Sequence, residues 1–176
     1  MKKILHAIIA FVPFFTAQAQ TQNEVKVNIL NTIVIGSVEV GYERYIANDQ
    51  SLGIDILIND RFSYLAERPA RGKVFKTNSV MLTYNFYLSG DRGSDFYFSP
   101  FFKYRFGHHE EVINDVVVKT DMENPILGLG IGYKWVWRDT FTIAPFANIG
   151  RNFNDDVNER FSAVEVNAGI GVGYRF

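Results

Sequence analysis

The chain has no cysteine, so neither a disulfide framework nor a lipid anchor on an N-terminal cysteine is possible. Neither sign of charge dominates, since the formal net charge is −1 at pH 7, and nothing here favours a nucleic-acid partner. Beyond the N-terminus, no stretch reaches the roughly eighteen consecutive apolar residues that a membrane-spanning helix requires. Stability must therefore come from the fold itself.

The N-terminus has the features of a secretory signal peptide. Residues 1–6 carry two lysines, residues 7–16 are almost entirely apolar, and residues 17–19 read Ala-Gln-Ala, a small-x-small cleavage site. We therefore expect residues 1–19 to be a signal peptide and residues 20–176 to form one exported domain. Removal of the signal peptide would take away two lysines and leave the exported domain slightly more acidic than the full chain.

The chain is rich in residues that suit strands. It contains 16 Phe, 9 Tyr and 14 Gly but only 5 Pro, a mixture that favours alternating strands over packed helices. Eight segments alternate apolar with polar or small residues, as half-polar strands do. These predicted strands cover residues 25–30, 37–46, 52–59, 79–88, 96–106, 127–137, 140–149 and 162–176.

The last of these segments shows the alternation without a break. Val164, Val166 and Ala168 project to one side, whereas Glu165 and Asn167 project to the other, and the pattern continues to the terminal aromatic residue. An even number of such strands in an exported chain is typical of a membrane barrel. The predicted fold class is therefore all-β, an eight-stranded antiparallel up-and-down transmembrane β-barrel.

The predicted connections alternate in length, which supports the same topology. Short polar links follow the second, fourth and sixth strands, at residues 47–50, 89–94 and 138–139. Long polar links follow the third, fifth and seventh strands, at residues 60–76, 107–124 and 150–161. We interpret the short links as periplasmic turns and the long ones as extracellular loops. The exception is the first outer link, residues 31–36, which is short and apolar.

Aromatic residues collect at the predicted periplasmic ends of the strands and on their apolar faces. Such residues form girdles where a barrel meets the membrane surface. The predicted girdle comprises Phe86, Phe96, Phe98, Trp135, Trp137, Phe141, Tyr174 and Phe176.

Together with the closing Gly-Tyr-Arg-Phe at residues 173–176, these features resemble small outer-membrane β-barrel proteins of the OmpA-transmembrane-domain and OmpX type. More narrowly, the stretch from Asn28 to Arg44 resembles the early part of an uncharacterised family of exported barrels. The resemblance implies a location in the cell outer membrane of a Gram-negative envelope and contact with its lipids, including lipopolysaccharide. It also implies that Tyr174 and Phe176 belong to a signal read by the barrel-assembly machinery, and we expect a monomer.

Charged residues on the polar faces predict a packed ionic interior. An eight-stranded barrel is only wide enough for side chains to fill it, so buried charges must pair with one another. We expect glutamate and aspartate to compensate lysine and arginine there, with glycines making room for the long basic side chains. The predicted network comprises Lys26, Glu39, Glu43, Asp55, Lys103, Arg105, Lys134, Glu165 and Arg175. An open pore is not expected.

No catalytic, cofactor or metal site is predicted. His108, His109, Glu110 and Glu111 carry metal-ligand atoms, but adjacent residues on an extended chain point apart. The glycines at alternate positions in residues 128–132 and 169–173 precede no helix that could receive a phosphate, so they are not nucleotide loops. The basic residues of the 60–76 loop are candidates for binding lipopolysaccharide phosphates.

Three classes of function remain open on this sequence. The leading one is a non-enzymatic barrel that contributes to envelope integrity or surface interaction through its loops. The second is a small pore or ligand-binding barrel. The third is a lipid-modifying enzyme, for which His108 and His109 lie at a suitable height, although no serine partner is evident.

Overall fold

The computed structural model describes residues 22–60, 74–90, 94–113 and 116–176. These residues form strands β1 (Asn23–Asn28), β2 (Val38–Tyr45), β3 (Gln50–Ile58), β4 (Val74–Tyr87), β5 (Asp95–Ile113), β6 (Val116–Asp121), β7 (Asn124–Trp137), β8 (Phe141–Asn152) and β9 (Val164–Arg175), with helices α2 (Ile29–Ile35) and α3 (Asp155–Arg160). The predicted signal peptide, residues 1–19, lies outside this range. So does residue range 61–73, which holds most of the basic loop.

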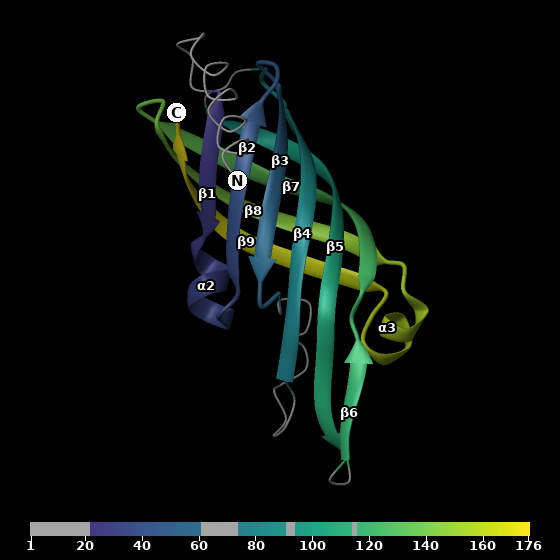
Figure 1. Cartoon of the computed structure of the whole chain (residues 1–176). Coiled ribbons are helices and arrows are strands. Elements are labelled where there is room, and N and C mark those ends of the chain that lie inside the picture. The colour runs from purple at the N-terminus through teal and green to yellow at the C-terminus, as the bar shows by residue number, and fades with distance from the viewer. Residues whose placement is uncertain (1–21, 61–73, 91–93, 114–115) are drawn as a thin grey trace, which may run out of the picture.

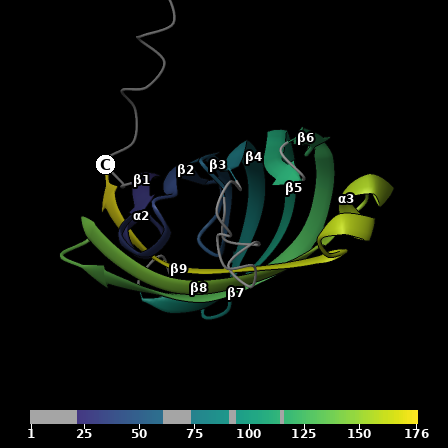
Figure 2. The same ribbon diagram turned by 90° about the horizontal axis from the view of Figure 1, so that it is seen from below.

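Eight of the strands close into an antiparallel barrel. The sheet runs in the order β4-β3-β2-β1-β9-β8-β7-β5, and β4 also pairs with β5, which closes the circuit. The closing pair is long, from Tyr87 opposite Tyr97 to Val74 opposite Glu110. Figures 1 and 2 show the closed wall from the side and along its axis. The predicted fold class, an eight-stranded antiparallel barrel, is confirmed.

The short connections gather at the end of the barrel where β1 begins and β9 ends (Figure 1). There Phe176 and Asn23 exchange backbone hydrogen bonds of 2.9 and 3.1 Å. Arg138 and Asp139 both have φ of 54°, the left-handed pair that a two-residue hairpin turn requires. We call this the turn end and the opposite end the loop end.

The loop predicted for residues 107–124 is wrong over most of its length. β5 continues to Ile113 and forms a hairpin with β6, in which Glu110 faces Lys119 and Val112 faces Val117. This hairpin extends beyond the barrel (Figure 1). Most of the hairpin therefore lies outside the barrel interior, and its sequence lacks the alternation of apolar and polar residues that marks the barrel strands.

Two helices also replace predicted coil or strand. The first strand ends at Asn28 rather than residue 30, and helix α2 occupies the predicted apolar link. Asn28 caps this helix by accepting a hydrogen bond from the Asn31 backbone N–H at 3.2 Å, while Gly36 ends it with φ of 65°. Helix α3 lies in the predicted 150–161 loop. None of the helices in the described ranges is long and apolar enough to cross a membrane.

The wall separates two kinds of side chain. Along β2, for example, Glu39 and Glu43 are buried in the interior, whereas Val40 and Tyr42 are exposed on the outer face. The same alternation runs around the barrel, because side chains on a strand have a period of two. The eight residues of the predicted girdle are all exposed on the outer face. The polar and charged side chains of the barrel wall are therefore gathered in its interior.

Candidate functional site

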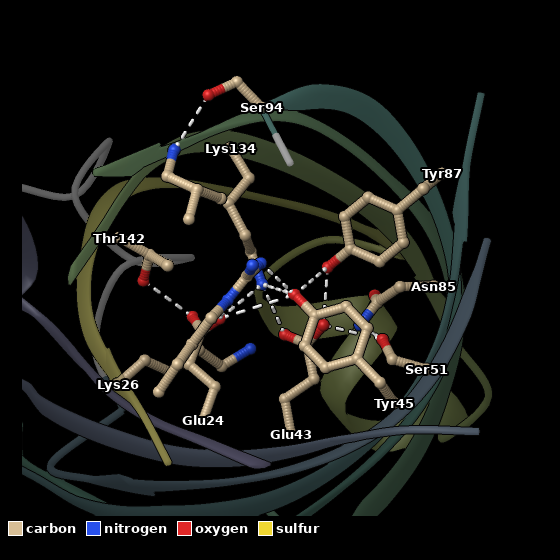
Figure 3. Close-up of polar contacts among 12 residues, drawn as sticks. Glu24, Lys26, Glu43, Tyr45, Ser51, Asn85, Tyr87, Ser94, Lys134 and Thr142 are labelled. Carbon is tan, nitrogen blue, oxygen red and sulfur yellow. Dashed lines mark hydrogen bonds and ion pairs between the residues drawn. The ribbon is translucent and has the colours of Figure 1, made fainter. Parts of the chain in front are cut away.

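Four charged side chains form a cluster inside the turn end of the barrel. Lys134 Nζ lies 3.1 Å from Glu24 Oε2 and 2.9 Å from Glu43 Oε2. On the other side of Glu24, Arg175 Nε lies 3.0 Å from the same oxygen. We call Glu24, Glu43, Lys134 and Arg175 the turn-side cluster, and its two negative and two positive charges balance. Figure 3 shows Lys134 together with Glu24 and Glu43.

Hydroxyl groups complete the hydrogen bonding of the turn-side cluster. Lys134 Nζ donates to the Tyr45 hydroxyl at 3.1 Å and lies 5.4 Å from the centre of the Tyr87 ring. Tyr87 donates to Glu43, and Ser51 Oγ donates to the same carboxylate oxygen at 2.6 Å. Buried charges are tolerated when their remaining donors and acceptors are satisfied in this way.

A second cluster lies toward the loop end. Glu165 contacts Lys103 Nζ through Oε1 and Arg105 Nη2 through Oε2, both at 2.6 Å. Asp60 Oδ2 lies 2.7 Å from Lys103 Nζ and 2.9 Å from Arg105 Nη2. All four side chains are buried. We call them the loop-side cluster, and its charges also balance.

Between the two clusters lies a single ion pair. Lys26 Nζ is 3.1 Å from Asp55 Oδ1, and Asp55 is buried. The pair lies over Gly41, where a Cβ atom would collide with the Asp55 carboxylate and with the Lys26 stem. Here a glycine does make room for a long basic side chain, as expected.

Other interior glycines make room for different groups. A Cβ atom at Gly132 would collide with the Tyr97 ring, and one at Gly128 would collide with the Phe101 ring. The expectation that the glycines serve the lysine and arginine side chains is therefore too narrow. Gly128 and Gly132 of β7 instead make room for aromatic rings from β5, the neighbouring strand, and Gly130 makes room for the Asn148 amide.

Replacing Gly41 by alanine is expected to lower the free energy of unfolding by about 1 to 3 kcal/mol, because the new methyl group overpacks the Lys26–Asp55 pair. Gly171→Ala is the matched control. Its nearest neighbour would be a backbone oxygen at 3.6 Å, an ordinary contact, so the change should be neutral or slightly stabilising. Urea unfolding of the two variants in lipid vesicles measures the difference, and equal midpoints would contradict this packing.

Glu39 does not pair as predicted. Its Oε2 accepts hydrogen bonds from Asn28 Nδ2 at 2.9 Å and Asn31 Nδ2 at 3.4 Å, and within the described residues it makes no ion pair. The reason is helix α2, which carries Asn31 over the interior, where its amide also donates to Asn167 at 3.2 Å. Amides rather than a cation thus surround this carboxyl group.

Two members of the clusters were not predicted. Glu24 lies one residue before the predicted start of its strand, but it shares the parity of Lys26, so a longer strand would have included it. Asp60 is five residues after Asp55, so strand alternation predicts that the two side chains lie on opposite faces, yet both are buried. Asn59 has φ of 58°, which turns the chain and sends Asp60 back into the interior, and alternation alone gives no sign of this.

The interior also contains apolar side chains and a small cavity. Leu57, Met81, Phe101 and Ile126 form a buried apolar group. A cavity of about 50 Å³ lies beside Lys26, Asp55 and Glu39. A site needs about 10 to 15 Å³ to hold one water molecule, so this volume accommodates only a few. Neither feature resembles a ligand pocket of several hundred cubic ångströms.

The histidines of the sequence HHEE point to opposite faces of β5. His108 Nε2 lies 3.1 Å from Glu110 Oε1, whereas His109 is buried with its ring edge-on to Phe161, 5.3 Å between centroids. Phe161 in turn packs on Met122 and Val157. In the part of the chain that the structure describes, no group of three or more His, Cys, Asp or Glu side chains could hold a metal ion.

Strands β4, β5 and β6 continue beyond the barrel as a sheet, which we call the projecting sheet. On its surface Glu110 forms ion pairs with two lysines: Oε1 lies 3.0 Å from Lys119 Nζ, and Oε2 lies 3.3 Å from Lys76 Nζ. These two lysines lower the pKa of Glu110 to about 2, so it stays ionised at any ordinary pH. Within the described residues β6 pairs only with β5, and Val116 and Val117 are exposed.

The closed wall, apolar outside and ionic inside, is the fold of the small eight-stranded outer-membrane β-barrels of the OmpA and OmpX type. Among solved structures, the chain is similar to the N-terminal β-barrel domain of Pseudomonas aeruginosa OprF, with a TM-score of 0.60 and 15% identity over 90% of this chain and 100% of that one. It is also similar to Neisserial surface protein A, with a TM-score of 0.53 and 13% identity over 88% and 95% of the two chains.

A third similar structure is Ail, the attachment invasion locus protein of Yersinia pestis, with a TM-score of 0.53 and 10% identity over 89% of this chain and 99% of that one. At such low identities the likeness concerns the fold alone. No family model and no curated protein matches the sequence.

Proposed function

We propose that this protein is a non-enzymatic integral β-barrel of the outer membrane that contributes to envelope integrity or surface interaction through its loop end. The observation that carries the proposal is the wall itself. Its strands pair around a closed circuit, which satisfies backbone groups in lipid. Its outer face exposes residues such as Leu129, Ile131 and Ile143, while the charged groups of the turn-side and loop-side clusters turn inward and pair.

The projecting sheet supports a role in surface interaction. It places exposed valines and the edge strand β6, which among the described residues pairs only with β5, beyond the barrel, at the end opposite the start of β1 and the end of β9 (Figure 1). Exposed edges are sites where other chains pair with a sheet. We propose that a protein or another surface partner binds here, on the extracellular side.

The interior favours a closed barrel over the pore or ligand-binding alternative. Two neutral ionic clusters fill its ends, and the cavity between them holds only a few water molecules. For the enzyme alternative, His108 pairs with Glu110 and the His109 ring packs on Phe161. Neither histidine is arranged with a serine nucleophile in the described residues.

We further propose that outer-membrane lipids, including lipopolysaccharide, surround a monomeric barrel. The C-terminal residues are suited to the proposed assembly signal. Tyr174 and Phe176 lie on the outer face, their rings stacked at 6.5 Å, and Phe176 pairs with the beginning of β1. Phe176 thus lies where the first strand, β1, pairs with the last strand, β9.

Single-cysteine variants can test both location and orientation, because the natural chain has no cysteine. We expect the protein in the outer-membrane fraction of cells. There Val117→Cys, on β6, should react with a membrane-impermeant maleimide in intact cells. Asp139→Cys, in a short turn, should react only after the cells are permeabilised.

Recovery of the protein in the soluble periplasmic fraction would contradict the membrane proposal. Labelling of Asp139→Cys but not Val117→Cys in intact cells would leave the protein in the membrane and reverse its orientation.

A further inference from the structure

Helix α2 exposes an apolar face at the loop end of the barrel. Ile33 is 82% exposed and Val34 is 65% exposed, and Ile29 and Leu30 are also exposed. No charged residue occurs between Lys26 and Glu39. Large apolar side chains that adjoin one another on a surface usually mark a contact site.

The orientation of this face is fixed by polar contacts on the other side of the helix. Asn31 points into the barrel and donates to Asn167 Oδ1 of β9 at 3.2 Å. Thr32 Oγ1 donates to the Asn28 carbonyl at 2.8 Å, and the cap at Asn28 fixes where the helix begins. With its one buried residue held inside, α2 must present Ile33 and Val34 outward.

The barrel wall is short where α2 stands. β1 has 6 residues, which rise about 20 Å along the strand. At the usual tilt of about 40° they cover only about 15 Å of height, less than the roughly 25 Å apolar band of a membrane barrel. The neighbouring strand β9 pairs with β1 only as far as Gly171 opposite Asn28. Beyond that point α2 packs against β9, so the helix occupies the missing part of the wall.

We propose that α2 is part of the lipid-facing wall and that hydrocarbon of the extracellular leaflet covers Ile33 and Val34. The face continues the exposed valines of the adjoining strands, Val27 and Val38. A helix of 7 residues is about 10 Å long, which matches the height that β1 lacks. The absence of charge fits hydrocarbon better than a polar partner. This inference rests on the proposed membrane location.

Fluorescence quenching by brominated lipids can test the contact. The two native tryptophans, Trp135 and Trp137, are replaced by phenylalanine, and Ile33→Trp is introduced as the single reporter. The protein is refolded into phosphatidylcholine vesicles whose acyl chains carry bromine either near the head groups or near the bilayer centre. The reporter should lose most emission with the shallow bromines, because an interfacial helix buries its apolar face about 5 to 10 Å deep.

Two comparisons make the result decisive. Val117→Trp in the same background, on the projecting sheet, should keep its emission in both vesicles. The unmodified protein should be quenched through its girdle tryptophans if the barrel is embedded. Quenched girdle tryptophans with an unquenched Ile33→Trp would overturn the role of α2 and leave the membrane proposal standing. Unquenched girdle tryptophans would overturn both.

Discussion

Replacing Glu165 by leucine is expected to lower the free energy of unfolding by about 3 to 5 kcal/mol. Glu165 is the partner of both Lys103 and Arg105, at 2.6 Å from each. Without it, the loop-side cluster keeps two buried cations and the single negative charge of Asp60. One positive charge then has no compensation, and the interior is too tightly filled to hydrate it.

Glu110→Leu is the matched control for this variant. Glu110 also contacts two lysines, Lys76 and Lys119, and it is also ionised at neutral pH. The two sites differ in solvent exposure, because the lysines around Glu110 lie on the surface of the projecting sheet. Ion pairs in contact with water contribute little to stability, so this variant should unfold close to the unmodified protein.

Urea unfolding in lipid vesicles compares the two variants, and equal midpoints would argue against a buried ionic cluster. A double variant sharpens the test. Glu165→Leu combined with Lys103→Met leaves Asp60 paired with Arg105 alone and restores neutrality. It should be more stable than Glu165→Leu by itself, with a coupling energy of about 0.5 to 3 kcal/mol.

The two-residue period of a strand determines which part of this arrangement the sequence can predict. Alternation assigns each residue to a face, and this is why the nine predicted charged residues all point inward in the structure. Alternation does not predict how far along the barrel axis each charged side chain lies, or which side chain it pairs with. Glu39 and Glu43 lie on the same face of β2, yet Glu43 pairs with Lys134 whereas Glu39 receives amide hydrogen bonds. The partner of each charge depends on strand stagger, which no single strand encodes.

The alternation of a strand does not predict where the residues at its ends lie. Asp60 follows the left-handed Asn59, which reverses parity at one residue. Helix α2 has 7 residues, too few to show a helical period against a background of apolar strands. Apart from His109, which packs on Phe161, the β6 hairpin lies outside the barrel interior, so burial imposes little alternation on it. In each case the missing information is tertiary: what covers the segment, rather than what the segment contains.

The assignment of the outer face leads to the second large effect, at Ile131. This residue lies in the middle of β7, opposite Phe98 and Ala147, and it is 63% exposed on the outside of the barrel. In the proposed membrane it meets hydrocarbon near the midplane. Ile131→Arg is therefore expected to lower the free energy of unfolding by about 2 to 4 kcal/mol.

Val112→Arg is the matched control, because it places the new arginine in water. Val112 was expected in a loop, but it lies on the part of β5 that belongs to the projecting sheet, where it faces Val117. It is exposed like Ile131, and both changes place an arginine on a strand. Only the medium around the new charge differs, so Val112→Arg should leave the stability nearly unchanged. Urea titration of both variants refolded into lipid vesicles measures the difference. An Ile131→Arg barrel as stable as the Val112→Arg barrel would mean that water, not hydrocarbon, surrounds this wall.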